Sequence, residues 1–148
     1  MRAVYRYLVM VLFVAILVQI GLAGYGAFHA IHAADHHEVT KKTIESGFDI
    51  HSALGAVIVI ALIALLVVAA VGRLGEVELL GAGILALLGV IQAVLGIVST
   101  SIPALGFLHA LNALAILAIS GWLAHRFGRE HRRAAPPPRE GGPTAEAL

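Results

Sequence analysis

Residues 51–71 of the chain read HSALGAVIVIALIALLVVAAV. After the opening histidine and serine, every residue of this stretch is apolar or glycine, and none is charged. A helix needs about 20 such residues to cross the hydrocarbon core of a bilayer, so the stretch predicts a transmembrane helix. Residues 4–28, 77–98 and 105–123 have the same character, with at most one charged residue in each. The chain is therefore predicted to cross a membrane four times.

The composition agrees with this prediction. Of the 148 residues, 59% are hydrophobic and 13% are charged, whereas a soluble domain has about 45–50% apolar and about 25% charged residues. This excludes an ordinary soluble domain, a disordered chain and a nucleic-acid-binding protein. The chain has no cysteine, which excludes disulfides, thiolate metal sites and iron–sulfur clusters. No segment alternates with period two over the length of a barrel strand, so a transmembrane β-barrel is not expected.

The positions of the basic residues predict the orientation, because cytoplasmic loops carry an excess of Lys and Arg. With the N-terminus inside, the cytoplasmic side carries Arg2, Arg6, Arg73, Arg126, Arg129, Arg132, Arg133 and Arg139. The other side carries only Lys41 and Lys42. We therefore expect a multi-pass protein of the inner or plasma membrane with both termini in the cytoplasm and the lipid bilayer as its main partner.

The predicted fold is an all-α, up-down-up-down four-helix transmembrane bundle that covers residues 1–126. Residues 127–148 contain a run of prolines and glycines and are predicted to form a disordered cytoplasmic tail. A cleaved signal peptide is the alternative for residues 4–28. The apolar run there exceeds the ~7–15 residues of a signal sequence, and no clean cleavage site follows it, so the transmembrane helix is preferred.

The few polar residues inside the predicted helices form an internal repeat. Gln19 and Gln92 both begin the pattern Q-x-x-L-small. His51 and His109 each follow a Gly-Phe pair by two or three residues. The chain is thus predicted to consist of two pseudo-symmetric helical hairpins, each with a glutamine in its outgoing helix and a histidine in its returning helix.

The two histidines are the strongest candidates for a cofactor site. His51 and His109 are predicted to lie at one depth, about 4–6 Å below the outer boundary. Positions i and i+4 share a helix face, and these positions hold Gly55 and Ala113, which leaves room for a flat macrocycle. Neutral imidazole is a standard axial ligand of haem iron. The sequence predicts a haem b bound by both histidines in the outer leaflet, in a protein of electron transfer or haem handling.

Three further polar residues are assigned to the same site. Gln19 and Gln92 are expected about 12–14 Å below the outer face. There they either lie beneath the macrocycle or bridge helices by hydrogen bonds. Asn112 either supports a propionate or makes a helix contact.

Two alternatives to a haem protein remain open. The first is a non-catalytic membrane protein, such as a subunit of a larger complex, whose polar residues only hold helices together. The second is a metal-binding membrane protein that uses the histidine-rich outer loop. His29, His32 and His36 share one face if the first helix continues outward, and they are candidate ligands of zinc, copper or nickel. A stand-alone enzyme is not the favoured interpretation. A redox or membrane-complex partner is compatible with the haem protein and with the non-catalytic subunit.

The same motifs resemble a known family. Q-x-x-L-A-G at Gln19, a single histidine at His51, Q-x-x-L-G at Gln92 and L-H-x-x-N-A-L at residues 108–114 are similar to those of a family of small bacterial four-helix membrane proteins. The resemblance covers nearly the whole chain up to Arg126. The function of that family is unknown, so the resemblance implies a fold and no reaction.

These stretches are more distantly similar to one four-helix half of haem A synthase. Each half of that enzyme places a histidine pair on its second and fourth helices around a haem, which implies that His51 and His109 are the axial pair here. The chain has one half only and lacks the cysteine pair of some haem A synthases. Glu45 and Asp49 match the acidic residue expected before the first histidine only approximately. The similarity thus implies cytochrome-like haem binding or haem handling rather than haem A synthesis.

Overall fold

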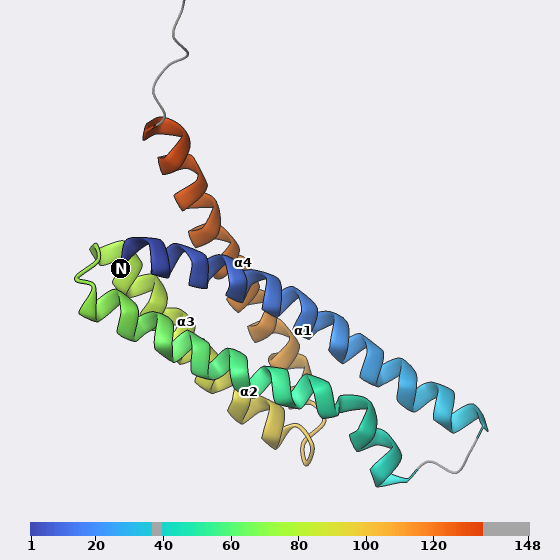
Figure 1. The fold of residues 1–148 in the computed structure, drawn as a ribbon. Coiled ribbons are helices and arrows are strands. Elements are labelled where there is room, and N and C mark those ends of the chain that lie inside the picture. Colours follow the sequence, from blue (N-terminus) through green and yellow to red (C-terminus); the bar gives the residue numbers. More distant parts are fainter. Residues whose placement is uncertain (37–39, 135–148) are drawn as a thin grey trace, which may run out of the picture.

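The structure is a computed structural model that describes residues 1–36 and 40–134. Its four helices are α1 (Arg2–His36), α2 (Lys41–Val71), α3 (Glu76–Val98) and α4 (Leu105–Ala134), shown in Figure 1. All four are long and apolar enough to cross a membrane, and the described part of the chain contains no strand. The predicted four-helix transmembrane bundle is confirmed.

The helices are arranged so that each contacts two neighbours. Both α2 and α4 pack against α1 and α3, and α2 and α4 therefore face each other across the diagonal of the bundle. The start of α1, the α2–α3 connection and the later part of α4 lie at one end, which carries Arg2, Arg73 and Arg129 and is called the basic end below. The α1–α2 and α3–α4 connections lie at the opposite end, called the histidine end.

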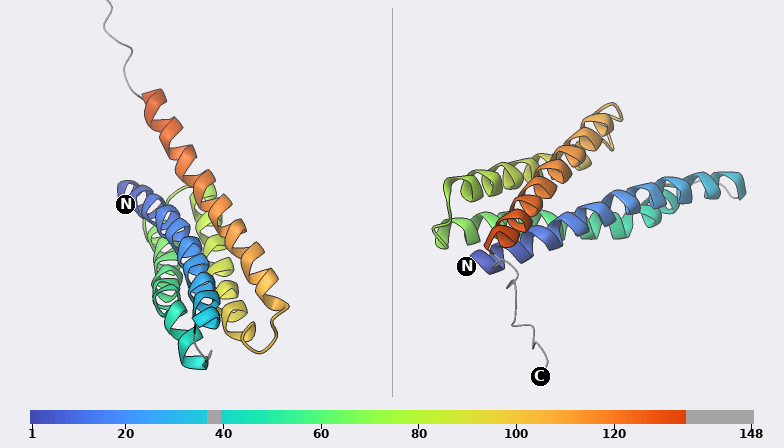
Figure 2. Two further views of the ribbon diagram at one scale, coloured as in Figure 1. Left: turned by 90° about the vertical axis from the view of Figure 1, so that its right-hand side faces the viewer. Right: turned by 90° about the horizontal axis from the view of Figure 1, so that it is seen from above.

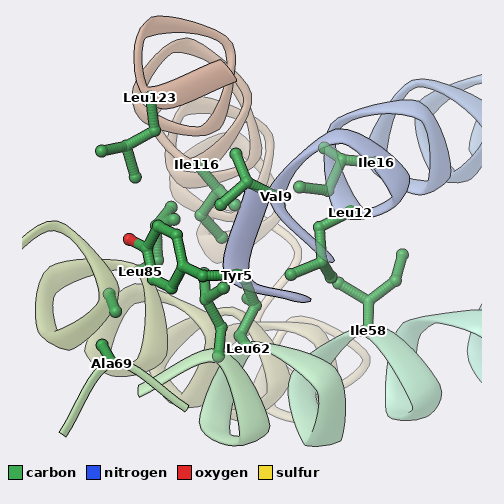
Figure 3. Close-up of a cluster of buried hydrophobic side chains, with 12 residues drawn as sticks. Tyr5, Val9, Leu12, Ile16, Ile58, Leu62, Ala69, Leu85, Ile116 and Leu123 are labelled. Carbon is green, nitrogen blue, oxygen red and sulfur yellow. The ribbon is translucent and has the colours of Figure 1, made fainter. Parts of the chain in front are cut away.

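The hydrophobic core occupies the half of the bundle nearest the basic end. Its residues recur every three or four positions, which places them on one face of each helix. Side chains of all four helices meet there (Figure 3). The buried members are Tyr5, Val9, Leu12 and Ile16 of α1, Ile58, Leu62, Leu65 and Ala69 of α2, Ala82 and Leu85 of α3, and Ile116 and Leu123 of α4.

The half of the bundle nearest the histidine end is built differently. The cluster of buried hydrophobic residues stops at Ile16, Ile58, Leu85 and Ile116, and the two hairpins diverge beyond it (Figure 2). Many of the partly buried positions there are small or polar. They include Gln19 and Ala23 of α1, His51 and Gly55 of α2, Gln92 and Gly96 of α3, and His109, Asn112 and Ala113 of α4, whereas Gly26 of α1 and Gly47 of α2 are buried. These residues form the surroundings of the candidate site.

Several helices run farther than the apolar stretches indicate. Helix α1 continues to His36 and α2 already begins at Lys41, where the Thr40 side chain accepts a hydrogen bond from the main-chain nitrogen of Thr43 as an N-cap. Most of residues 29–50, roughly the outer loop expected between the first two apolar stretches, is therefore helical. Hydropathy marks where the bilayer ends, and helices of polar residues continue past that point wherever the local sequence permits.

The C-terminal boundary also differs from the predicted one. Helix α4 ends at Ala134 rather than at residue 126, and its last turns project beyond the other three helices (Figure 1). The remainder of the predicted tail, residues 135–148, lies outside the described residues.

Candidate functional site

In the structure, the internal repeat is visible as the same histidine–main-chain hydrogen bond in both hairpins. Nδ1 of His51 lies 3.1 Å from the main-chain oxygen of Gln19. Nδ1 of His109 lies 3.2 Å from the main-chain oxygen of Gln92. Because a carbonyl oxygen only accepts, Nδ1 carries the proton in both rings, and Nε2 keeps its lone pair. Each hairpin thus fixes the ring and the tautomer of its own histidine.

The two rings come together although they belong to diagonally opposite helices. The ring centres of His51 and His109 are 6.4 Å apart, and the ring planes are inclined by 56°. Both side chains are half-buried, so neither is directed entirely into lipid. The structure therefore brings together the pair that the repeat singles out.

In the second hairpin, Gln92 and Asn112 complete a hydrogen-bonded chain. Nε2 of Gln92 lies 3.1 Å from Nε2 of His109. The side-chain nitrogen of Asn112 donates to the side-chain oxygen of Gln92 at 2.6 Å and to the main-chain oxygen of Leu88 at 2.9 Å. Of the two roles predicted for Asn112, the structure shows the helix contact, because both acceptors lie on α3.

In the first hairpin, fewer of the corresponding polar atoms have a hydrogen-bond partner. The side-chain nitrogen of Gln19 donates to the main-chain oxygen of His51 at 2.7 Å, which bridges α1 and α2. The side-chain oxygen of Gln19 is buried and has no hydrogen-bond partner. Among the residues that the structure describes, Nε2 of His51 has none either; the ring bonds through Nδ1. For the buried oxygen of Gln19, the missing donor costs about 1–3 kcal/mol.

The small residues near the histidines have roles that the sequence did not distinguish. A side-chain carbon at Gly55 would lie 2.9 Å from the side-chain nitrogen of Gln19, so Gln19 takes the room that Gly55 provides. A carbon at Gly96 would lie 3.2 Å from Cε1 of His109, which makes Gly96 a neighbour of the ring. Ala113 is half-buried on the same helix as His109.

His29, His32 and His36, at the end of α1, make ring contacts of their own. Because α1 runs to His36, His32 and His36 are one turn apart and their ring centres are 4.4 Å apart. His29 stacks on Tyr25 instead, at 5.9 Å between ring centres. Residues 37–39 lie outside the described chain. Within the described residues, no three histidine or acidic side chains form a group that holds a metal ion.

The site therefore presents two half-buried imidazoles, with ring centres 6.4 Å apart, beyond the end of the buried hydrophobic cluster. Each ring is oriented by a main-chain carbonyl, an arrangement that also fixes ligating histidines in metalloproteins. Comparison of the chain with protein-family models, with curated proteins and with solved structures finds no match. The resemblances given above rest on the sequence motifs.

Proposed function

We propose that this protein is a membrane-bound haem b protein in which His51 and His109 are the two axial ligands of the iron. The separation of the two rings carries the proposal. An imidazole nitrogen binds a metal ion at about 2 Å and lies about 1 Å from its ring centre, so two imidazoles on opposite sides of one metal have ring centres about 6 Å apart. The observed separation is 6.4 Å.

The number of ligands favours haem over a free metal ion. A zinc site needs three or four protein ligands, and the described residues offer no group of three. A porphyrin brings four nitrogen ligands of its own, so that two histidines complete the coordination. Haem is thus the metal group that best suits two facing imidazoles.

The surroundings of the pair support the same proposal. The buried hydrophobic cluster ends before the histidines are reached, and the hairpins diverge there (Figure 2). The buried side-chain oxygen of Gln19 lacks a donor. Folded proteins leave few buried polar atoms without a hydrogen-bond partner, so this oxygen of Gln19 is consistent with an additional group in this half.

The proposed activity is electron transfer or haem handling. A haem with both axial positions filled supplies a one-electron iron couple rather than oxygen chemistry. The chain itself would orient the imidazole rings of the two histidines through Gln19 and Gln92. It would also exclude water from the part of the site that lies in the bilayer. Such a protein requires a redox or membrane-complex partner to deliver or accept the electron or haem.

The proposed location is the inner or plasma membrane with both termini in the cytoplasm. The basic end carries every arginine of the described chain, including Arg2, Arg6 and Arg73, whereas Lys41 and Lys42 lie at the histidine end. The positive-inside rule then places the basic end in the cytoplasm and the histidine pair in the outer leaflet.

The test is an absorption spectrum of the full-length protein purified in detergent, oxidised and then reduced with dithionite. We expect a Soret band and the sharpened visible bands of a reduced, six-coordinate haem b. The pair is tested with His51→Ala and His109→Ala, each of which should abolish the six-coordinate spectrum. His125→Ala is the matched control, since His125 is exposed near the basic end of α4. A folded protein that takes up no haem when haem is supplied contradicts the proposal.

One observation favours a second candidate. The bonds of Asn112 to Leu88 and Gln92 join α3 and α4 without any cofactor, as expected of a non-catalytic membrane subunit whose polar residues hold helices together. That candidate predicts a colourless protein in which His51→Ala and His109→Ala lower stability and change nothing else.

A further inference from the structure

The two histidines differ at Nε2, the ring nitrogen that is available to bind a metal because Nδ1 carries the proton in both rings. Both rings donate through Nδ1 to a main-chain oxygen. Nε2 of His109 also lies 3.1 Å from the side-chain nitrogen of Gln92, and because Nδ1 holds the proton, the amide N–H donates to the Nε2 lone pair. The corresponding amide of Gln19 donates to the main-chain oxygen of His51 instead, so the repeat is symmetric in its main-chain bonds and asymmetric at Nε2.

Gln92 is oriented for this bond by its neighbour. Asn112 donates to the side-chain oxygen of Gln92 at 2.6 Å and is itself held by the main-chain oxygen of Leu88. With its oxygen occupied by Asn112, the amide of Gln92 turns its nitrogen toward His109. The first hairpin has no such arrangement, since the side-chain oxygen of Gln19 has no partner.

A second, independent difference lies four residues after each glutamine. The first hairpin has Ala23 at this position and the second has Gly96. A side-chain carbon at Gly96 would lie 3.2 Å from Cε1 of His109, closer than ordinary van der Waals contact. The absence of that carbon gives the His109 ring room to lie against α3, where Gln92 holds it.

From these differences we propose that His51 is the permanent axial ligand and His109 the exchangeable one, so that the haem site admits a small neutral diatomic ligand in place of His109. The proposal rests on the haem function proposed above. A single lone pair on Nε2 serves either the iron or the Gln92 amide, and Gln92 therefore competes with the iron for His109. In the exchange, the bond between iron and Nε2 breaks and a bond between iron and the incoming ligand forms, without transfer of an electron or a proton.

The experiment is a carbon monoxide titration of the full-length, haem-loaded protein after reduction with dithionite, followed by the shift of the Soret band. We expect wild type to bind carbon monoxide. His109→Ala should retain haem and bind carbon monoxide at least tenfold more tightly, because nothing competes for the position. His51→Ala should lose most of its haem, because the remaining ligand is the one that Gln92 withdraws.

Gln92→Met tests the competition itself. This change removes the amide and keeps both the side-chain length and the main-chain oxygen that accepts from Nδ1. Loss of one hydrogen bond of ordinary net strength should lower the apparent affinity for carbon monoxide about fivefold. Gly96→Ala should also lower the apparent affinity for carbon monoxide, since its new carbon disfavours the position of the His109 ring against α3. If Gln92→Met does not fold, Gly96→Ala tests the competition in its place. His125→Ala is the control that should bind as wild type does.

The outcomes separate this inference from the proposed function. A protein that binds haem but excludes carbon monoxide, or that loses haem equally in His51→Ala and His109→Ala, overturns the inference and leaves the haem function intact. Carbon monoxide affinity that is unchanged or raised in both Gln92→Met and Gly96→Ala also overturns it. A protein that takes up no haem overturns both proposals.

Discussion

Gln92 contacts both nitrogens of the His109 ring, with its main-chain oxygen 3.2 Å from Nδ1 and its side-chain nitrogen 3.1 Å from Nε2. The first contact has a counterpart between Gln19 and His51, and the second has none. The two hairpins thus share the bond that orients the histidine and differ in the one that engages its Nε2 lone pair. This single difference separates two otherwise equivalent imidazoles.

The Asn112 network should contribute to stability without any cofactor. Asn112→Ala removes two hydrogen bonds between α3 and α4, each worth about 0.6 kcal/mol on average between transmembrane helices, so we expect a loss of about 1 kcal/mol. Unfolding of the purified protein by a denaturing detergent measures it. Ser120→Ala is the matched control on α4, because the Ser120 hydroxyl bonds only to Leu117 of its own helix. An Asn112→Ala protein as stable as Ser120→Ala would contradict the inter-helix role.

Gly89, in the packed core, and Gly55, beside Gln19, should respond differently to one added methyl group. At Gly89 the new carbon would lie 2.8 Å from Leu62, which is 1% exposed in the packed core, so Gly89→Ala should cost about 1–3 kcal/mol through overpacking. At Gly55 the new carbon would meet only the end of the half-buried Gln19 side chain.

We therefore expect Gly55→Ala to cost less than 1 kcal/mol, since Gln19 can move aside. Gly21→Ala is the control, because nothing lies within 4 Å of its added carbon. The same unfolding measurement compares all three proteins. Equal costs at Gly55 and Gly89 would show that the Gln19 side chain is held as firmly as Leu62.

The proposed haem, once bound, should raise the stability of the protein. A ligand that binds only the folded state stabilises it by about 2.7 kcal/mol when its free concentration is a hundred times its dissociation constant. The unfolding midpoint of the haem-loaded protein should thus exceed that of the haem-free protein, and the difference should vanish in His51→Ala. A gain from haem that persists in His51→Ala would indicate binding elsewhere on the protein.

The orientation can be tested cleanly because the chain has no cysteine of its own. Single cysteines are placed at Ser101, in the exposed α3–α4 connection, and at Glu76, exposed at the basic end. The positive-inside rule predicts that a membrane-impermeant maleimide labels Ser101→Cys in intact cells and labels Glu76→Cys only after lysis. The reverse pattern would place the histidine pair in the inner leaflet.

Much of the architecture follows from the sequence for a physical reason. A polar group costs so much in hydrocarbon that the four apolar stretches had to become helices, and their number is confirmed. The same cost makes Gln19, His51, Gln92 and His109 conspicuous, so their repeat could be recognised without coordinates. The outward extension of α1 and α2 could not be predicted in this way, because polar residues in water carry no comparable penalty.

The tertiary structure decided what each of these side chains contacts. Sequence periodicity places a residue on a helix face only to within a turn. A hydrogen bond is made or lost over a few tenths of an ångström. Whether it forms therefore depends on the offset between the packed helices. Only the structure could therefore show that Gln92 reaches Nε2 of His109 while Gln19 turns to a main-chain oxygen of α2. It also shows that Gln19 fills the space beside Gly55 and that Gly96 lies against the His109 ring.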